Sequence, residues 1–304
     1  MRLAALLALS IPLLAAPALD AQPPADTGDF LRDETTWRAW RLERLTSETS
    51  WLTLIGLHWL REGDNALGSA PDSRLPLPAD KATAKVANLR LERGAVTLIP
   101  EPGVELVAGG RPISAATRLA TDHDEEATLV ELGSLNFYVL VRGDRVGLRV
   151  RDREAKLRRE FPGLDYFPPD PAYRLTARFT PNPPGTTVPM VNVIGITEAV
   201  PSPGKLTVTL GGAERTLVAL DDTGDGRLFL ILGDLTNGRE TYGAGRYLYT
   251  DPPADGVTVL DLNRLYNPPC AFTAYSTCQL PPRENELPLR LEVGEKKFVP
   301  PAPA

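Results

Sequence analysis

The sequence is poor in the residues on which most enzyme and metal sites depend. Its 304 residues include only two histidines, two cysteines and two methionines. No G-x-S-x-G motif is present, and two histidines cannot support a defensible Ser/His/Asp order. The Gly-Ala-Gly at 243–245 lacks the strand–turn–helix context of a dinucleotide fingerprint. Classical serine hydrolases and Rossmann enzymes are therefore excluded, and no cofactor is predicted.

The sequence also lacks a block of basic residues. Its formal net charge is −6, and lysine and arginine are scattered along the chain. Nucleic-acid binding depends on neutralising phosphates with clustered positive charge. We therefore expect no nucleic-acid partner, and an acidic membrane surface is disfavoured for the same reason.

Long apolar runs are confined to the amino terminus. Arg2 precedes an apolar run at 3–14, and small residues follow around Ala16 and Ala21. This is the anatomy of a Sec signal peptide, whereas a membrane span needs about 20 apolar residues. We assign residues 1–21 to a signal peptide, with a mature chain that begins near Gln22 and has no membrane span. The predicted location is the periplasm or the cell exterior.

Proline and glycine, in contrast, are abundant. Thirty prolines and twenty-five glycines separate short runs of β-branched and apolar residues, which is typical of a mainly β protein. One helix is expected within 22–50, where Phe30, Trp37, Trp40 and Arg44 recur at helical spacing. The tryptophans 37, 40, 51 and 59 are interpreted as the stripe that docks this helix on a sheet, with an exposed aromatic platform for sugars as the alternative. A β-sandwich is expected over 51–168, and a second β domain over 169–299. The boundary is placed at the prolines 168–171, after a short helix within 152–160.

Both cysteines lie in one short stretch, YNPPCAFTAYSTCQLPPRENELPL, at 266–289. In an exported protein a disulfide between Cys270 and Cys278 would persist, and closing so short a loop would stabilise the fold by roughly 2 to 3 kcal/mol. Two packed thiols or a metal site are the alternatives. The spacing is not that of a zinc site, so no metal is predicted.

The two histidines and two acidic stretches have simple structural interpretations. His58 lies in an apolar strand and is interpreted as a half-buried strand residue. His123 lies in the acidic stretch TDHDEE, which predicts a solvated turn. Calcium binding by its acidic side chains is the alternative. The run DDTGDG at 221–226 lacks the glutamate that an EF-hand needs, and it predicts a hairpin turn.

The second half carries the polar residues on which a function could rest. The first block supplies Asp234, Thr236, Asn237, Tyr242 and Arg246, and the second supplies Asp261, Asn263, Arg264, Tyr266, Asn267, Asn285, Glu295 and Lys296. They can be turn residues and an internal ion-pair network. Alternatively, these loops close one pocket, where arginines bind an anion and Tyr and Asn orient it.

Four stretches carry a resemblance to a known family. They are DLTNGRETYGAGRYL at 234–248, the block at 260–298, GLHWLREGDNALGS at 56–69 and FPGLDYFP at 161–168. Together they resemble the family called domain of unknown function 1684, for which no activity is implied. The first half more weakly resembles the strand order of a forkhead-associated sandwich, through residues 62–68, a hairpin at 89–99, residues 109–113 and a strand at 135–141. That resemblance implies the scaffold alone, because Ser69 stands where such domains have an arginine.

Two functions follow as expectations. The first is an exported binding or structural module whose C-terminal domain holds a small polar or anionic ligand. The alternative is a hydrolase that uses Asp234 or Asp261 as a general base, with Arg246 stabilising negative charge.

Overall fold

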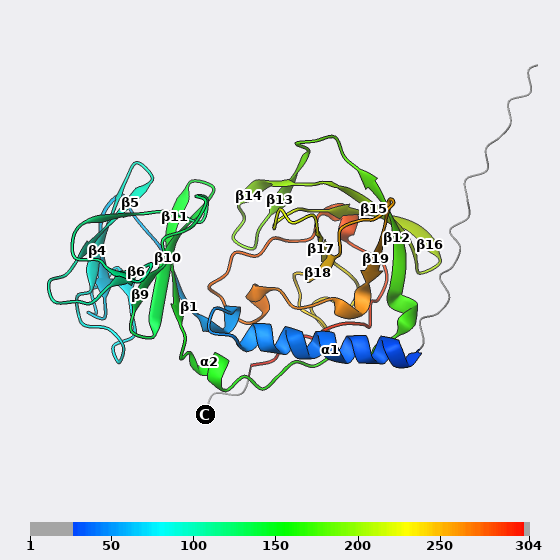
Figure 1. Ribbon diagram of the computed structural model, residues 1–304, viewed down its shortest axis with the longest axis horizontal. Coiled ribbons are helices and arrows are strands. Elements are labelled where there is room, and N and C mark those ends of the chain that lie inside the picture. Colours follow the sequence, from blue (N-terminus) through cyan, green and yellow to red (C-terminus); the bar gives the residue numbers. More distant parts are fainter. Residues whose placement is uncertain (1–26, 301–304) are drawn as a thin grey trace, which may run out of the picture.

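The computed structural model describes residues 27–300. The predicted signal peptide at 1–21 lies outside the described residues. Strands make up 41% of the structure and helices 14%, which confirms the mainly β class. Two β domains lie side by side, and one long helix runs along the second (Figure 1). None of the helices in the described part of the chain is both long and apolar enough to cross a membrane.

The first domain is a sandwich of two sheets. The six-stranded sheet has the order β1 (Leu54–Trp59), β11 (Arg145–Asp152), β10 (Leu135–Arg142), β9 (Val130–Leu132), β6 (Val107–Ala108) and β7 (Arg111–Pro112). The five-stranded sheet has the order β3 (Leu75–Pro76), β2 (Gly63–Gly68), β4 (Ala87–Glu92), β5 (Ala95–Pro100) and β8 (Thr117–Leu119). Alternating apolar residues such as Leu89, Leu98, Phe137 and Leu148 fill the space between the sheets. The sandwich predicted for this half is thereby confirmed.

Tight turns connect these strands as the sequence indicates. Arg93 and Gly94 have positive φ values of 49° and 81° in the β4–β5 hairpin, and Gly143 turns the chain between β10 and β11. After β11, helix α2 (Lys156–Arg159) falls inside the short helix predicted at 152–160.

The second domain is barrel-like. A four-stranded sheet has the order β16 (Ala213–Ala219), β15 (Gly204–Leu210), β12 (Arg174–Pro181) and β19 (Val257–Asp261). A two-stranded sheet is formed by β17 (Leu228–Leu232) and β18 (Arg246–Thr250). The bridge between Leu220 and Phe229 joins the two sheets on one side, and β18 packs beside β19 on the other. Leucines from all of these strands except β12, which contributes Ala177, fill the interior.

A second apolar cluster covers the outside of β17 and β18. The hairpin of β13 (Thr187–Val191) and β14 (Thr197–Pro201) contributes Met190 and Val200 to it. Phe229, Tyr247 and Tyr266 pack there with edge-to-face geometry. This cluster lies on the side of the barrel that also receives Trp37 and Trp51, so it joins the barrel to the amino-terminal helix region.

Helix α1 (Thr27–Thr46) is present, but its buried face differs from the predicted stripe. Trp40 is 50% exposed, so its assignment to the docking stripe was wrong, and Arg44 is also exposed. The buried positions are Phe30, Glu34, Arg41 and Leu45. Their spacing of four, seven and four residues is helical, but two of them are charged, which hid them from a search for apolar periodicity.

Candidate functional site

The thirteen polar residues singled out in the second half do not line one open pocket. Eight are buried: Thr236, Arg246, Asp261, Asn263, Tyr266, Asn267, Asn285 and Glu295. Asn237, Tyr242, Arg264 and Lys296 are half-buried, and the side chain of Asp234 is fully buried. The structure sorts them into three polar groups, with Asn285 apart.

The first group surrounds Arg246, which is 0% exposed. Its guanidinium donates to Asp234 Oδ2 and to the carbonyl of Leu291, each at 2.9 Å, and also to the carbonyls of Val293 and Glu295. Burial lowers the pKa of this guanidinium, while the carboxylate of Asp234 acts in the opposite direction. Arg246 therefore fastens the C-terminal segment to the start of β18, and its charge is neutralised inside the protein.

Gly245 makes this arrangement possible. It has a positive φ of 86°, and a Cβ there would lie 2.8 Å from the carbonyl oxygen of Leu232. Only glycine allows the chain to approach that closely before Arg246 turns inward.

The rest of the first group is a closed turn. Asp234 Oδ1 accepts from the backbone N–H of Thr236 at 2.8 Å and from its hydroxyl at 2.5 Å. Asn237 accepts from the N–H of Asp234 and donates to the carbonyl of Tyr242. Both oxygens of Asp234 are thus occupied by partners from its own domain.

The second group surrounds Glu295, which is also 0% exposed. Its carboxylate accepts from Arg41 Nε and from the backbone N–H of Asn267, both at 2.7 Å. Arg41 also lies 4.6 Å from the ring centroid of Tyr266, whose pKa burial raises. Asn267 donates to the carbonyl of Lys296 at 2.7 Å. Helix α1 is therefore tied to the C-terminal segment through one buried ion pair.

The third group lies where α1 meets the 3-10 helix η3 (Leu262–Arg264). Asp261 Oδ1 accepts from the backbone and side-chain amides of Asn263, and Arg264 Nε lies 3.0 Å from Glu34 Oε1. Burial raises the pKa of Glu34, and the nearby charge of Asp261 raises it further. Asp261 Oδ2 and Glu34 Oε2 are buried without a hydrogen-bond partner.

Asn285 lies apart from these groups, on the edge of β16. Its amide accepts from the N–H of Val218 at 2.7 Å and donates to the carbonyl of Val218 at 2.9 Å. A side-chain amide that pairs with one backbone unit in this way replaces a missing strand neighbour.

The cysteine loop connects the two domains. Cys270 and Cys278 lie at disulfide distance, with Cα atoms 6.1 Å apart. Between them, Thr273 donates to the carbonyl of Leu54, and Thr277 accepts from Arg142 Nε at 3.1 Å. Both cysteines therefore occur where the C-terminal domain contacts the first domain.

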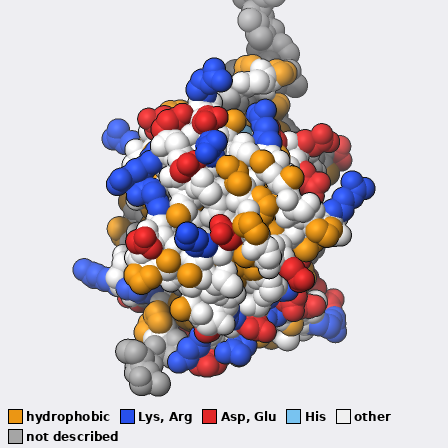
Figure 2. Space-filling view, turned by 90° about the vertical axis from the view of Figure 1, so that its left-hand side faces the viewer, with side chains coloured by type: hydrophobic (Ala, Val, Ile, Leu, Met, Phe, Trp, Pro, Cys, Tyr) orange, Lys and Arg blue, Asp and Glu red, His pale blue; other side chains and the backbone are white. Residues whose placement is uncertain are grey.

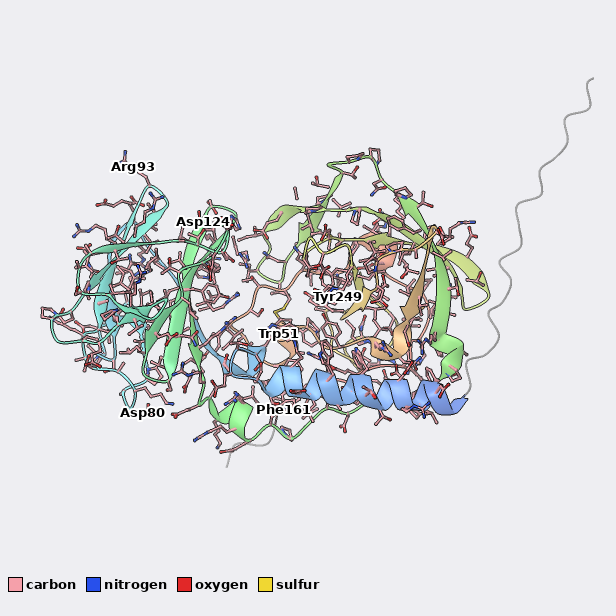
Figure 3. All side chains as sticks on the ribbon, viewed as in Figure 1. Trp51, Asp80, Arg93, Asp124, Phe161 and Tyr249 are labelled. Carbon is pink, nitrogen blue, oxygen red and sulfur yellow. A yellow bond between two sulfur atoms is a disulfide. The ribbon has the colours of Figure 1, made fainter. Side chains whose placement is uncertain are left out.

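Arg41 and Glu34, the partners of Glu295 and Arg264, were missed in the sequence. They lie on the helix more than 200 residues before their partners. The available signal was their helical spacing with Phe30 and Leu45. Figure 3 shows that this helix leads directly to Trp51, between the two domains.

The histidines and acidic turns have the local positions expected of them. His58 is half-buried in β1, where burial lowers its pKa. His123 is exposed, beside a hollow lined by Asp124, Glu125 and Glu126. Residues 221–226 form the turn between β16 and β17. Among residues 27–300 no three His, Cys, Asp or Glu side chains lie close enough together to hold a metal ion.

Comparison with known proteins identifies relatives without an assigned activity. The sequence profile described as "Protein of unknown function (DUF1684)" matches residues 159–296. The solution structure of an uncharacterized protein from Haloarcula marismortui is 33% identical over 46% of this chain and 78% of its own, with a TM-score of 0.39. No curated protein matches.

Forkhead-associated domains are among the solved structures found. One is the domain of FhaA in complex with the intracellular domain of another protein, at 18% identity over 31% of this chain and 97% of its own, with a TM-score of 0.23. A second comes from a study of phosphothreonine-dependent interactions, at 18% identity over 33% of this chain and 96% of its own, also with a TM-score of 0.23. At these scores the likeness says nothing of the ligands of this chain. The profile match spans all thirteen polar candidates of the second half, and the chain belongs to the family described as Protein of unknown function (DUF1684).

Proposed function

We propose that the chain is an exported binding or structural module in which the motif residues of the C-terminal domain hold the structure together. One observation carries the proposal: Arg246 is completely buried, and its two terminal nitrogens donate to Asp234 and three carbonyls, whereas its Nε is buried without an acceptor. A charge that is neutralised internally has no capacity left for a ligand anion. In this proposal the motifs fasten α1, the cysteine loop and the C-terminal segment to the barrel.

A small polar or anionic ligand in this domain would use the members of the set that remain partly accessible. These are Asn237, Tyr242, Arg264 and Lys296. Arg264 already pairs with Glu34, so it would offer only its remaining guanidinium nitrogens. The ligand would therefore bind beside the ion-pair groups and not between their members.

Export is part of the same proposal. The run at 1–14 supports it, and so does the cysteine pair, because disulfides persist in oxidising compartments. N-terminal sequencing of the protein from a native-like host tests it. A mature terminus near Gln22 is expected, and an intact Met1 in a soluble cytoplasmic fraction would refute export.

One observation favours the enzyme alternative, and it concerns Asp261 only. Its Oδ2 atom has no hydrogen-bond partner, and Glu34 beside it has a raised pKa. A carboxylate oxygen without a hydrogen-bond partner is able to accept a proton, which a general base requires. Asp234, with both oxygens bonded, does not offer this.

The structural and ligand roles of Arg246 are distinguished by one variant. If the role is structural, Arg246→Ala lowers the melting temperature of the protein alone. If Arg246 binds a ligand, the melting temperature stays nearly unchanged and stabilisation by small anionic metabolites is lost. The enzyme alternative requires that Asp261→Asn abolish a hydrolytic activity found by screening ester and phosphoester substrates, without unfolding the protein.

A further inference from the structure

The outer face of the first domain's six-stranded sheet carries arginines without counter-charges. Alternation along β10 and β11 sends Phe137 and Leu148 into the sandwich core and sends their neighbours to the opposite face. Strand register pairs Tyr138 with Arg149, and Asn136 with Arg151. Four polar side chains are thus adjacent on one face.

This face lies at the junction with the C-terminal domain. Leu54, the register partner of Arg151, accepts a hydrogen bond from Thr273 of the cysteine loop. Farther along the sheet, Arg142 bonds Thr277 of the same loop. The loop therefore contacts the sheet on which the arginines lie, and Arg149 is only 8% exposed.

Arg149 is buried without a compensating carboxylate. Its only hydrogen bond within the described residues goes from Nη1 to the hydroxyl of Tyr138, at 3.1 Å. Nε and Nη2 of Arg149 and Nε of Arg151 are buried without an acceptor, and Oδ1 of Asn136 is buried without a donor. Leaving a buried guanidinium unpaired costs several kcal/mol in the general case.

The two arginines also repel each other. Their guanidinium carbons lie 5.9 Å and 5.2 Å from the ring centroid of the same residue, Tyr138. Like charges that share one aromatic ring, partly removed from water, destabilise the fold.

The acidic residues nearby in the chain are engaged elsewhere. The pairs are Asp122 with Arg142, Glu131 with Arg153, and Asp152 with Lys81. The described part of the protein therefore offers no carboxylate to neutralise Arg149 and Arg151.

We propose that Arg149 and Arg151, together with Tyr138, form a binding site for a small phosphate-type dianion at the domain junction. The Nε and Nη2 edge of Arg149 offers a bidentate pair of donors, which suits phosphate oxygens. Two guanidinium charges match a dianion, and Nε of Arg151 supplies a third donor. This site lies on a sheet face of the first domain, so it is separate from the ligand residues of the C-terminal domain.

The test is thermal unfolding of the intact chain in low-salt buffer, with inorganic phosphate as the probe and sodium chloride at equal ionic strength as the reference. A ligand that binds only the native state raises the melting temperature in proportion to the logarithm of its concentration. Phosphate is expected to raise it and chloride is not. Equal effects of both salts would overturn the proposal.

Variants on one strand sharpen this test. Arg149→Met keeps an unbranched, flexible side chain and removes the charge, so the phosphate effect is expected to disappear while stability without phosphate stays equal or rises. Arg149→Lys is expected to bind phosphate at least about tenfold more weakly, because the bidentate edge is lost. Arg145→Met is the matched control: Arg145 is exposed on the same strand, above the ring of Trp59.

The remaining outcomes decide the role of Arg149, the charge of the bound anion and its source. If Arg149→Met lowers stability without phosphate and wild-type protein ignores phosphate, Arg149 is a packing residue and the proposal fails. If acetate stabilises as strongly as phosphate, the dianion assignment is wrong. Methyl phosphate as a second probe separates the sources: equal stabilisation indicates a phosphomonoester ligand, and stabilisation by inorganic phosphate alone indicates the free ion.

Discussion

The buried arginines of the two domains are in opposite electrostatic situations. In the C-terminal domain, Arg246 and Arg41 each meet a fully buried carboxylate, at 2.9 Å and 2.7 Å. In the first domain, Arg149 is almost as deeply buried and meets only a tyrosine hydroxyl. Burial by itself therefore does not separate a structural arginine from a ligand-binding one, whereas the presence of an internal counter-charge does.

The exposed surface of the first domain has no excess of either charge. Figure 2 shows the end of the molecule formed by the first domain, where Lys and Arg alternate with Asp and Glu and no broad surface has one sign. The unpaired arginines lie away from this mixed surface, on the sheet that the cysteine loop covers. Their lack of partners is therefore a feature of the junction.

The largest expected effect is that of Arg246→Ala. It leaves Asp234 buried without its partner and removes donors from three carbonyls, so we expect a loss of roughly 3 to 5 kcal/mol in the free energy of unfolding. Urea denaturation measures it. Arg290→Ala, which removes an exposed arginine paired with Glu240 and Glu292, should cost less than about 1 kcal/mol. Equal losses of stability in the two variants would show that the buried ion pair of Arg246 stabilises the fold no more than an exposed one.

Glu295→Ala should have the next largest effect, about 3 kcal/mol, because it leaves Arg41 buried without its carboxylate. Since Arg41 is on α1, the helix amides should lose protection from hydrogen exchange before those of the barrel strands. Glu292→Ala is the exposed control on the same segment. Full protection of α1 in the Glu295 variant would show that the ion pair does not hold the helix.

Replacing both Cys270 and Cys278 by serine should lower the free energy of unfolding by roughly 2 to 3 kcal/mol if the two are bridged. The loop would also cover the outer sheet less firmly, so Arg149 should become more accessible. Denaturation with and without reductant measures the first effect, and adding reductant to the double variant is the control. A wild-type protein that is indifferent to reductant would contradict the bridge.

The smallest effect concerns Glu34 and depends on pH. Its pKa in the folded protein is raised above 4.5, so the native state holds this proton more tightly than the unfolded chain does. Its contribution to stability is therefore fully present below pH 4.5 and is lost as the pH rises through the folded-state value. Glu34→Gln does not titrate, so its stability relative to wild type should increase with pH over that window.

Thermal unfolding from pH 4 to neutral pH measures this difference, with Glu43→Gln on the exposed face of α1 as the control. A Glu34→Gln variant that becomes progressively less stable than wild type as the pH rises would contradict the sign.

Local patterns predicted much of the fold. Alternating strands, the turns at Gly94 and Gly143, and the short helix before the second domain follow from contacts between near neighbours in the chain. The face of α1 did not follow, because Trp40 fits an apolar stripe in sequence and yet lies in solvent, while Glu34 and Arg41 are buried. Glu34 and Arg41 are buried against charged partners from distant parts of the chain, Arg264 and Glu295.

The contacts of the candidate site were also predicted only in part from the sequence. The sequence indicated an internal ion-pair network among the thirteen residues, and Asp234 and Arg246 form one of its pairs. It gave no sign that Tyr242 contributes a carbonyl, or that Asn285 completes a strand edge.

By itself, the sequence determined the mainly β class, the family motifs and the positions of most turns, because these depend on interactions over a few residues. Only the tertiary structure decided which charges are neutralised. Arg246 and Arg149 look alike in the sequence, each within a strand rich in apolar residues. Packing brings a carboxylate to the first and the cysteine loop over the second, and an electrostatic interaction depends on distance in space, not on separation along the chain.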